Sequence, residues 1–336
     1  MIILLQKNLL SMNKLIILVL VALALLYKAS AQNFIKSYNG SKSICGIYGF
    51  KEDSINNKLY MYGNILNTPC SLTNNYIACN QNGTWSFLGP FNHSISSFEI
   101  FNNELYACGW FSNVNGQPIT SLAKYNGTSW TPVANFSSAV NLWKLKVINN
   151  ELYVCGGTIN TTDGNFNGVA KFNGTNWTGF NVPYLGNSGF YVNDAIYFNN
   201  ELYLGGNFSL STGEEDLIYY HTGQWQKPSA GIYGSMSAVK KLEVYKNRLY
   251  IGGLIFKGDG NVGNMLIAWD GNNLLPVGDG LKDNLNTYGS AQVHDMMIFK
   301  DKLYIAGTFN YAGNIFSCGL TIFDGNTFCS LNKTPQ

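Results

Sequence analysis

Asn102-Asn103-Glu104-Leu105-Tyr106 is one copy of a five-residue motif that returns along the chain. The same residue types stand at 149–153 and 199–203, and close variants stand at 56–60, 246–250 and 300–304. The motif ends at Tyr60, Tyr106, Tyr153, Tyr203, Tyr250 and Tyr304, so successive copies are 46, 47, 50, 47 and 54 residues apart. Self-similarity at a period of about 50 residues is the signature of a repeat architecture. The chain is therefore predicted to hold six copies of one unit.

Each copy is predicted to form four antiparallel strands. An apolar stretch such as Ala195–Phe198 comes first, and a two-residue turn, usually Asn-Asn, joins it to the Leu-Tyr strand. Asn suits this turn because it tolerates positive φ better than most residues. Asn-Gly and Asp-Gly are strong hairpin signals, and a second tight turn is predicted between the third and fourth strands. These second turns are Asn82-Gly83, Asn126-Gly127, Asn173-Gly174, Thr222-Gly223, Asp270-Gly271 and Asp324-Gly325.

The expected fold class is all-β, with residues 32–336 forming a single β-propeller of six four-stranded blades. The composition agrees, because 46% of residues are hydrophobic, 12% are charged and 36 are glycines. Blades around an axis bury both faces of each sheet and hide most strand edges, which one four-stranded repeat cannot do alone. A linear solenoid is disfavoured because its repeats are usually shorter. Residues 32–44 would complete a seventh blade or close the ring, so seven blades is the alternative.

The repeat resembles a known family. Gly206-Asn207-Phe208, Gly307-Thr308-Phe309 and the segments 123–127 and 170–177 look like units of many secreted propellers, which are distant relatives of kelch repeats and of the galactose oxidase central domain. The fungal cortical marker of cell polarity carries similar units. The resemblance covers nearly all of residues 45–332 and implies the propeller fold. It implies little about activity, because propellers host unrelated functions.

The N-terminal 31 residues are predicted to be a signal peptide. Lys7 and Lys14 precede the apolar run Leu15–Leu26, and Ala29-Ser30-Ala31 supplies a cleavage site before Gln32. A membrane anchor is the alternative, although the run is short for a bilayer. Without residues 1–31 the chain has 18 basic and 19 acidic residues. We therefore expect a secreted protein, monomeric, with no membrane span after cleavage and no nucleic-acid partner.

Export leads to two further expectations. Most of the seven cysteines should be oxidised to disulfides, although an odd number leaves at least one thiol over. Ten Asn-X-Ser/Thr sequons would carry glycans if the source is eukaryotic. These sequons begin at Asn39, Asn82, Asn92, Asn126, Asn135, Asn160, Asn173, Asn176, Asn207 and Asn332.

Residues with catalytic chemistry are few. The three histidines are His93, His221 and His294, and no HExxH, GxSxG or CxxC pattern occurs. A copper site like that of galactose oxidase would need two His and two Tyr with a crosslinked Cys, and no cluster of His and Tyr supports one. No catalytic residue, metal site or cofactor is predicted. A role for His294 beside Asp295 is the one hint of acid-base or metal chemistry.

The first strand of each repeat carries a recurrent polar position, which we call the axial position. It is assigned to Lys51, Ser97, Lys144, Asp194, Lys241 and Asp295. Equivalent positions in a closed ring converge on its axis, and side chains alternate along a strand with a period of two. The predicted ligand-binding residues are Asp194, Asp295, His294, Lys51, Lys144 and Lys241. The alternative is that these side chains only hydrate a channel and pair with one another.

Three functions fit this sequence. The first is a non-catalytic extracellular binding or scaffold module that recognises carbohydrate or protein through one propeller face. The second is a secreted hydrolase or oxidoreductase with its site at the axial mouth, where groups that break the repeat would cluster with shifted pKa values. The third is a structural surface or matrix component. The absence of catalytic motifs favours the first.

Overall fold

A computed structural model gives the fold in two compact units, residues 1–93 and 94–336, which are described separately. It describes residues 42–67, 75–82, 84–134, 140–161, 163–180, 182–183, 191–209, 215–228, 231–233, 238–283 and 291–330. The predicted signal peptide lies outside these residues.

The first unit holds the first repeat as one antiparallel sheet in the order β1-β2-β3-β4. Its strands are β1 (Lys42–Asp53), β2 (Lys58–Asn67), β3 (Asn75–Gln81) and β4 (Thr84–Phe91). Met61, Ile65 and Tyr76 form its buried core.

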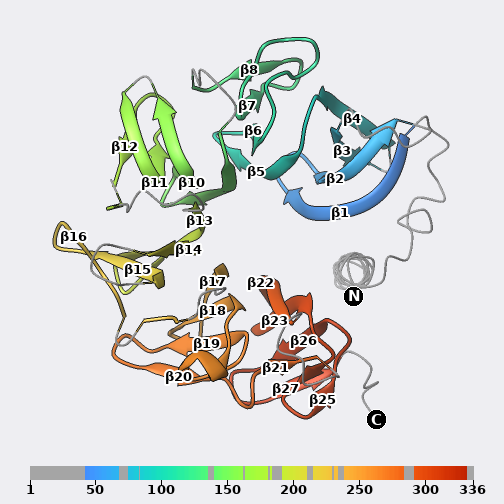
Figure 1. Ribbon diagram of the computed structural model, residues 1–336. Helices are drawn as coiled ribbons and strands as arrows, with labels where there is room; N and C mark the ends of the chain where they lie inside the picture. The colour runs from blue at the N-terminus through green and yellow to red at the C-terminus, as the bar shows by residue number, and fades with distance from the viewer. Residues whose placement is uncertain are drawn as a thin grey trace, which may run out of the picture. The chain divides into compact units, whose positions relative to one another are not determined.

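The second unit holds five four-stranded antiparallel sheets, one for each remaining repeat (Figure 1). The second repeat forms β5 (Ile95–Phe101), β6 (Glu104–Gly109), β7 (Leu122–Tyr125) and β8 (Trp130–Pro132). The third forms β9 (Leu142–Ile148), β10 (Glu151–Thr161), β11 (Gly164–Phe172) and β12 (Trp177–Gly179). The fourth forms β13 (Tyr191–Phe198), β14 (Glu201–Ser209), β15 (Glu215–His221) and β16 (Gln224–Gln226). The fifth forms β17 (Ala238–Tyr245), β18 (Arg248–Leu254), β19 (Leu266–Trp269) and β20 (Leu274–Pro276). The sixth forms β22 (Gln292–Phe299), β23 (Lys302–Thr308), β26 (Leu320–Phe323) and β27 (Phe328–Ser330).

The four-stranded repeat is thus confirmed in all six copies. A further sheet has three strands of two residues each: β21 (Leu281–Lys282), β24 (Tyr311–Ala312) and β25 (Ile315–Phe316). Counting it, the described residues form seven sheets, the number that the alternative prediction allowed. It arises beside the last repeat and not from residues 32–44. A short 3₁₀ helix, Lys257–Asp259, lies between β18 and β19.

Neighbouring sheets of the second unit pack face to face. The first strands β5, β9, β13, β17 and β22, here called the inner strands, contact one another in this order. Each hydrophobic cluster joins two consecutive sheets, as Tyr106 with Leu145 and Tyr203 with Leu242 do. The repeat tyrosines Tyr106, Tyr153, Tyr203 and Tyr250 are at most 2% exposed, which explains why the repeat carries a large ring there.

The first hairpin turn is confirmed as a two-residue turn in the second unit. Asn102 and Asn103 have φ of 50° and 62°, and Asn149, Asn150, Asn199 and Asn200 repeat these values within a few degrees. Both central residues of a type I′ turn need positive φ, and its twist matches that of the flanking strands.

The second hairpin turn is a longer motif than predicted in four of the six repeats. Phe172 pairs with Trp177, so four residues, not two, connect β11 and β12. Asn173 Oδ1 accepts the N–H groups of Thr175 and Asn176, both at 2.8 Å. A short polar side chain can stabilise a turn in this way by bonding to its own backbone. Asn126, Asp270 and Asp324 accept equivalent pairs of N–H groups.

The turn glycine has positive φ in this longer motif, and a substitution tests its role. Gly174 has φ of 104°, so Gly174→Val should lower the free energy of unfolding by about 1–3 kcal/mol. Thr175→Val at the exposed neighbour should cost far less. Both variants should be made without N-glycans, because Thr175 completes a sequon with Asn173. Equal shifts of the two thermal midpoints would contradict the proposed role of Gly174.

The expectation that most cysteines form disulfides is wrong for this structure. Cys79, Cys108, Cys155 and Cys329 are free thiols, so at most three of the seven can pair. Cys108 and Cys155 occupy the position on the second strand where later repeats have Gly205 or Gly252. Burial raises the pKa of both thiols. They act there as small apolar residues with little thiolate reactivity.

Candidate functional site

The strand registers fix which residues are equivalent in the inner strands. Each axial residue of the second unit lies opposite a small residue of the second strand of its sheet. These pairs are Ser97 with Cys108, Lys144 with Cys155, Asp194 with Gly205, Lys241 with Gly252, and Asp295 with Ala306. The predicted axial set is therefore one structural position in these five sheets.

The assignment of Lys51 to this position is wrong by two residues. In the first repeat Lys51 lies opposite Tyr60, whereas Gly49 lies opposite Tyr62 at the place where the other sheets have the axial residue. The cause is the hairpin turn. Asp53 pairs with Lys58, so this turn has four residues instead of two, and Asp53 caps it through Asn56. The axial position is polar in five repeats, and the first repeat has glycine.

Axial side chains satisfy backbone groups at the inner edge of the strands. An inner strand has N–H groups that no further strand of its own sheet can accept, and buried N–H groups without a partner are costly. Ser97 Oγ accepts the N–H of Leu145 in the next sheet at 3.2 Å. Asp194 accepts the N–H of Ala195 at 2.9 Å and that of Leu242 in the next sheet at 3.0 Å. The polar axial position therefore has a structural role.

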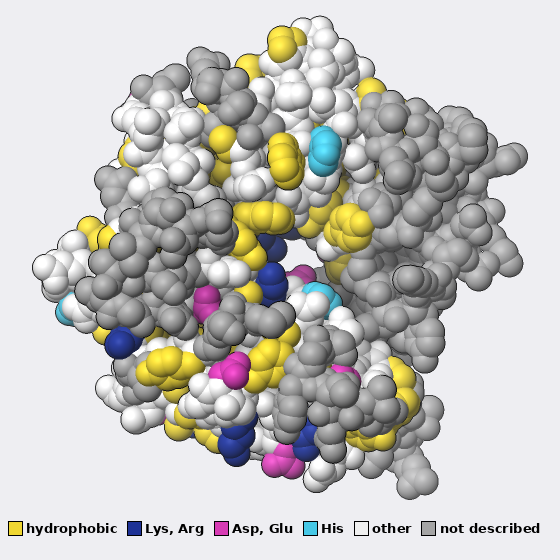
Figure 2. All heavy atoms as spheres, in the orientation of Figure 1, with side chains coloured by type: hydrophobic (Ala, Val, Ile, Leu, Met, Phe, Trp, Pro, Cys, Tyr) yellow, Lys and Arg dark blue, Asp and Glu magenta, His cyan; other side chains and the backbone are white. Residues whose placement is uncertain are grey.

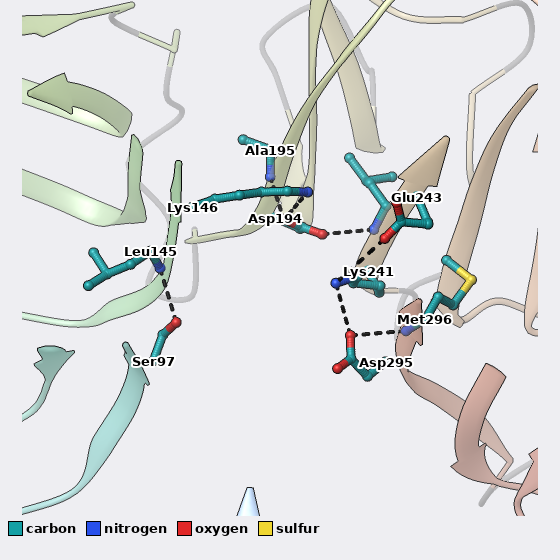
Figure 3. A network of polar contacts seen from close by, with 10 residues as sticks. Ser97, Leu145, Lys146, Asp194, Ala195, Lys241, Glu243, Asp295 and Met296 are labelled. Atoms are coloured by element: carbon teal, nitrogen blue, oxygen red, sulfur yellow. Dashed lines mark hydrogen bonds and ion pairs between the residues drawn. The ribbon is translucent and has the colours of Figure 1, made fainter. Parts of the chain in front are cut away.

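Ion pairs join the inner strand β9 to β13 and the inner strand β17 to β22, and the hydrogen bond from Leu242 to Asp194 links β13 to β17 (Figure 3). Lys146 Nζ lies 3.2 Å from Asp194 Oδ1, and Asp194 is fully buried. Lys241 Nζ lies 2.9 Å from Asp295 Oδ1 and 4.0 Å from Glu243 Oε2. The Asp295 side chain is 64% exposed. Solvent there weakens its pair with Lys241.

The charges of this network stabilise one another. Burial opposes ionisation of Asp194, but the ammonium groups of Lys146, Lys241 and Lys144 outweigh it and lower the pKa of its carboxyl. Burial also opposes the charge of Lys241, and nearby Asp295, Asp194 and Glu243 raise its pKa instead. Both groups are therefore ionised at neutral pH.

The structure thus brings together five of the six predicted ligand-binding residues. Asp194, Lys241 and Asp295 belong to the ion-pair network, Lys144 lies within electrostatic reach of both aspartates, and His294 precedes Asp295. Lys51 belongs to the first unit and to another register position.

A β-bulge precedes the axial residue in every inner strand, which the sequence reasoning missed. The register shifts between Val192 and Asp194, between Val239 and Lys241, and at the same place in the other sheets. The bulged residues of the second unit are Ser96, Trp143, Asn193, Lys240 and His294. Bulges commonly lie next to functional sites, where they re-aim side chains.

Four side chains meet at this end of the inner strands, and we call them the rim: Trp143, Tyr191, Lys240 and His294. The rings of Trp143 and Tyr191 lie 5.3 Å apart between centroids, tilted by 43°. Lys240 Nζ lies 5.8 Å from the centroid of Tyr191. His294 Nε2 lies 2.8 Å from Thr308 Oγ1, and partial burial followed by the charge of Lys240 lowers its pKa.

The rim is accessible. Trp143 is 40% exposed and Trp110, which follows the end of β6 opposite the start of β5, is 54% exposed. Figure 2 shows hydrophobic side chains gathered at the edge of the hollow that the inner strands line, with charged side chains inside it and a histidine at its margin. Exposed aromatic rings grouped beside polar groups mark interaction sites.

Comparison with known proteins supports the fold. No family model matches the chain, and no curated protein matches its sequence. The β-propeller domain of the trilobed protease from Pyrococcus furiosus aligns with 86% of this chain and 85% of its own at 12% identity, with a TM-score of 0.50. The computationally designed protein Ika8 aligns with 84% of this chain and 73% of its own at 10% identity, with a TM-score of 0.44.

The likeness to the Pyrococcus domain identifies the fold and does not extend to kelch proteins or the polarity marker. Among the described residues no helix is long and apolar enough to span a membrane. The sheets, their order and this likeness together make the chain an all-β protein with the β-propeller fold, which supports a binding or scaffold module.

Proposed function

We propose that this protein is a secreted, non-catalytic binding module that recognises carbohydrate at the rim. The observation that carries the proposal is the exposed Trp143 ring packed against Tyr191, with Lys240 beside it. Flat apolar ring faces with polar groups at their edges suit sugars, which present apolar C–H faces and peripheral hydroxyls. A rigid aromatic ring also offers large contact area at a small cost in conformational entropy.

The axial network is less suited to the ligand because its groups already bind one another. Asp194 accepts two N–H groups and an ammonium, and it is fully buried. A ligand there would have to replace contacts that are stronger than those it could offer. The rim side chains of the described residues contact one another through the Trp143–Tyr191 and Lys240–Tyr191 pairs, which leave ring faces and the ammonium open to a ligand, and His294 contacts Thr308.

A glycan array tests this proposal. The unmodified protein, residues 32–336, should bind a subset of glycans, and Trp143→Ala should weaken that binding at least about tenfold, as removal of a central aromatic contact does. Ile298→Ala is the control, because Ile298 is 42% exposed but lies near the other end of β22 from His294. Binding that both variants keep, or no glycan binding at all, would contradict the proposal.

Secretion is part of the proposal and rests on residues 1–31. Material recovered from the medium should begin at Gln32, allowing for cyclisation of that residue. Retention of the chain in membranes with residues 12–31 intact would contradict it.

A further inference from the structure

We infer that the rim selects acidic carbohydrate, with a sugar ring on Trp143 and Tyr191 and a carboxylate bound by Lys240. This inference rests on the proposed function and narrows its ligand to glycans that carry uronic acids. Trp143, Tyr191 and Lys240 come from three consecutive sheets, so the ligand would lie across the starts of β9, β13 and β17.

Lys240 differs from its neighbours Lys146 and Lys241 in the inner strands. Lys146 and Lys241 are held by Asp194 and Asp295, whereas Lys240 forms no ion pair with any carboxylate among the described residues. Its ammonium instead lies over the Tyr191 ring, which attracts it but does not neutralise it. An uncompensated cation beside an aromatic face is complementary to an anion attached to an apolar ring face.

The groups around Lys240 do not cancel its charge. The carboxylate of Asp295 follows His294 in the chain, but it is bound to Lys241 at 2.9 Å. His294 has a lowered pKa, caused first by burial and then by Lys240, so it is neutral at pH 7. A neutral imidazole offers a hydrogen bond to a sugar hydroxyl without adding charge.

The β-bulges explain why the rim residues differ from one repeat to the next. The axial position must carry groups that cap the inner edge, so its residues are restricted. The bulged residue next to it has no place in the ladder, and the five repeats of the second unit put five different residues there: Ser96, Trp143, Asn193, Lys240 and His294. A position released from the repeat is free to serve recognition.

The probes are short oligomers that contain one of four uronic acids, each tested with its methyl ester. These acids are galacturonate, glucuronate (in hyaluronan), mannuronate and guluronate (in alginate). The protein should be made without N-glycans, because exposed Asn207 lies opposite Tyr191 and belongs to a sequon. At least one acid should bind, and its ester should bind at least about tenfold more weakly, since a charge-assisted hydrogen bond is lost.

Lys240→Gln should bring the affinity for the acid down to that for the ester, and Lys240→Arg should restore most of it. Lys302→Gln is the matched control, because it also removes one lysine charge. Lys302 belongs to the sixth repeat and lies opposite Phe299, at the end of β22 that is far from His294. Thermal midpoints of all variants should agree within a few degrees, which separates lost binding from lost folding.

Three results would overturn the inference: equal affinity for acid and ester, unchanged affinity of Lys240→Gln for the acid, or no binding of any uronic acid. If the ester still binds and Trp143→Ala abolishes that binding, the carbohydrate-binding function stands and only the acidic specificity is wrong. If no uronic acid binds but a neutral glycan does, the same conclusion follows. If no glycan binds at all, both the carbohydrate-binding function and the acidic specificity are wrong.

Discussion

Asp194→Ala is expected to lower the free energy of unfolding by about 3 kcal/mol or more, because removal of one partner from a buried ion pair leaves the other charge uncompensated. The Lys146 side chain is only 20% exposed, burial already lowers its pKa, and it would lose its main counter-charge. The N–H groups of Ala195 and Leu242 would lose their acceptor in a buried place, which adds to the loss. Chemical unfolding of the purified variant measures the difference.

Asp295→Ala is the internal comparison, since it removes the same group from the equivalent position. The Asp295 side chain is 64% exposed, and Lys241, although only 12% exposed, keeps Asp194 and Glu243 as neighbouring carboxylates, so the expected cost is about 1–2 kcal/mol, less than that of Asp194→Ala. An equal loss in the two variants would mean that Asp194 does not link the inner strands as described.

The pH dependence of stability has a definite sign. The folded-state pKa of Asp194 is lowered, so its stabilising contribution is complete above the unfolded pKa of about 3.9 and is lost as the pH falls through the folded value. The stability gap between the wild type and Asp194→Ala should therefore be constant from about pH 8 to pH 5 and shrink below about pH 4. A gap that instead widens in acid would contradict this assignment.

The repeat pattern predicts the sheets well because its signals are local. The Leu-Tyr strand, the Asn-Asn turn and the buried tyrosine follow from strand periodicity and from the positive φ of residues such as Asn102 and Asn103. The axial residues Asp194 and Asp295 are predictable for the same reason, since a constant number of residues separates them from the turn in each of their repeats.

The sequence predicts the axial position less well where a repeat has a turn of a different length. Two extra turn residues displace Lys51, and only the pairing of Gly49 with Tyr62 reveals the shift. The bulges are invisible for a related reason, because Trp143 and Lys240 look like ordinary members of an alternating strand. The sequence signal of a bulge is variety: the bulged residue differs in every repeat of the second unit, whereas the residue before it is always a branched aliphatic residue. These preceding residues are Ile95, Leu142, Val192, Val239 and Val293.

For an alanine at Gly205 or Gly252, strand propensity and packing predict opposite effects on stability. Glycine inside a strand is usually destabilising by about 0.5–1 kcal/mol relative to alanine, so propensity alone predicts that Gly205→Ala stabilises β14. The packing predicts the reverse. A Cβ on Gly205 would lie 2.3 Å from Cγ1 and 3.0 Å from Cβ of Val239, a fully buried residue of the next inner strand.

Gly205→Ala is therefore expected to destabilise the protein by about 2–3 kcal/mol, since overpacking of this kind outweighs the gain in propensity. Val239 is β-branched and has few alternative rotamers, so the two sheets must move apart to admit the methyl group. Gly258→Ala is the matched control, because nothing lies within 4 Å of its Cβ and its backbone is not left-handed. That variant should change stability by no more than about 0.5 kcal/mol. The thermal midpoints of both variants decide between the two effects: a Gly205→Ala protein as stable as the wild type would show that propensity prevails and that β14 and β17 are not packed as closely as the inner strands require.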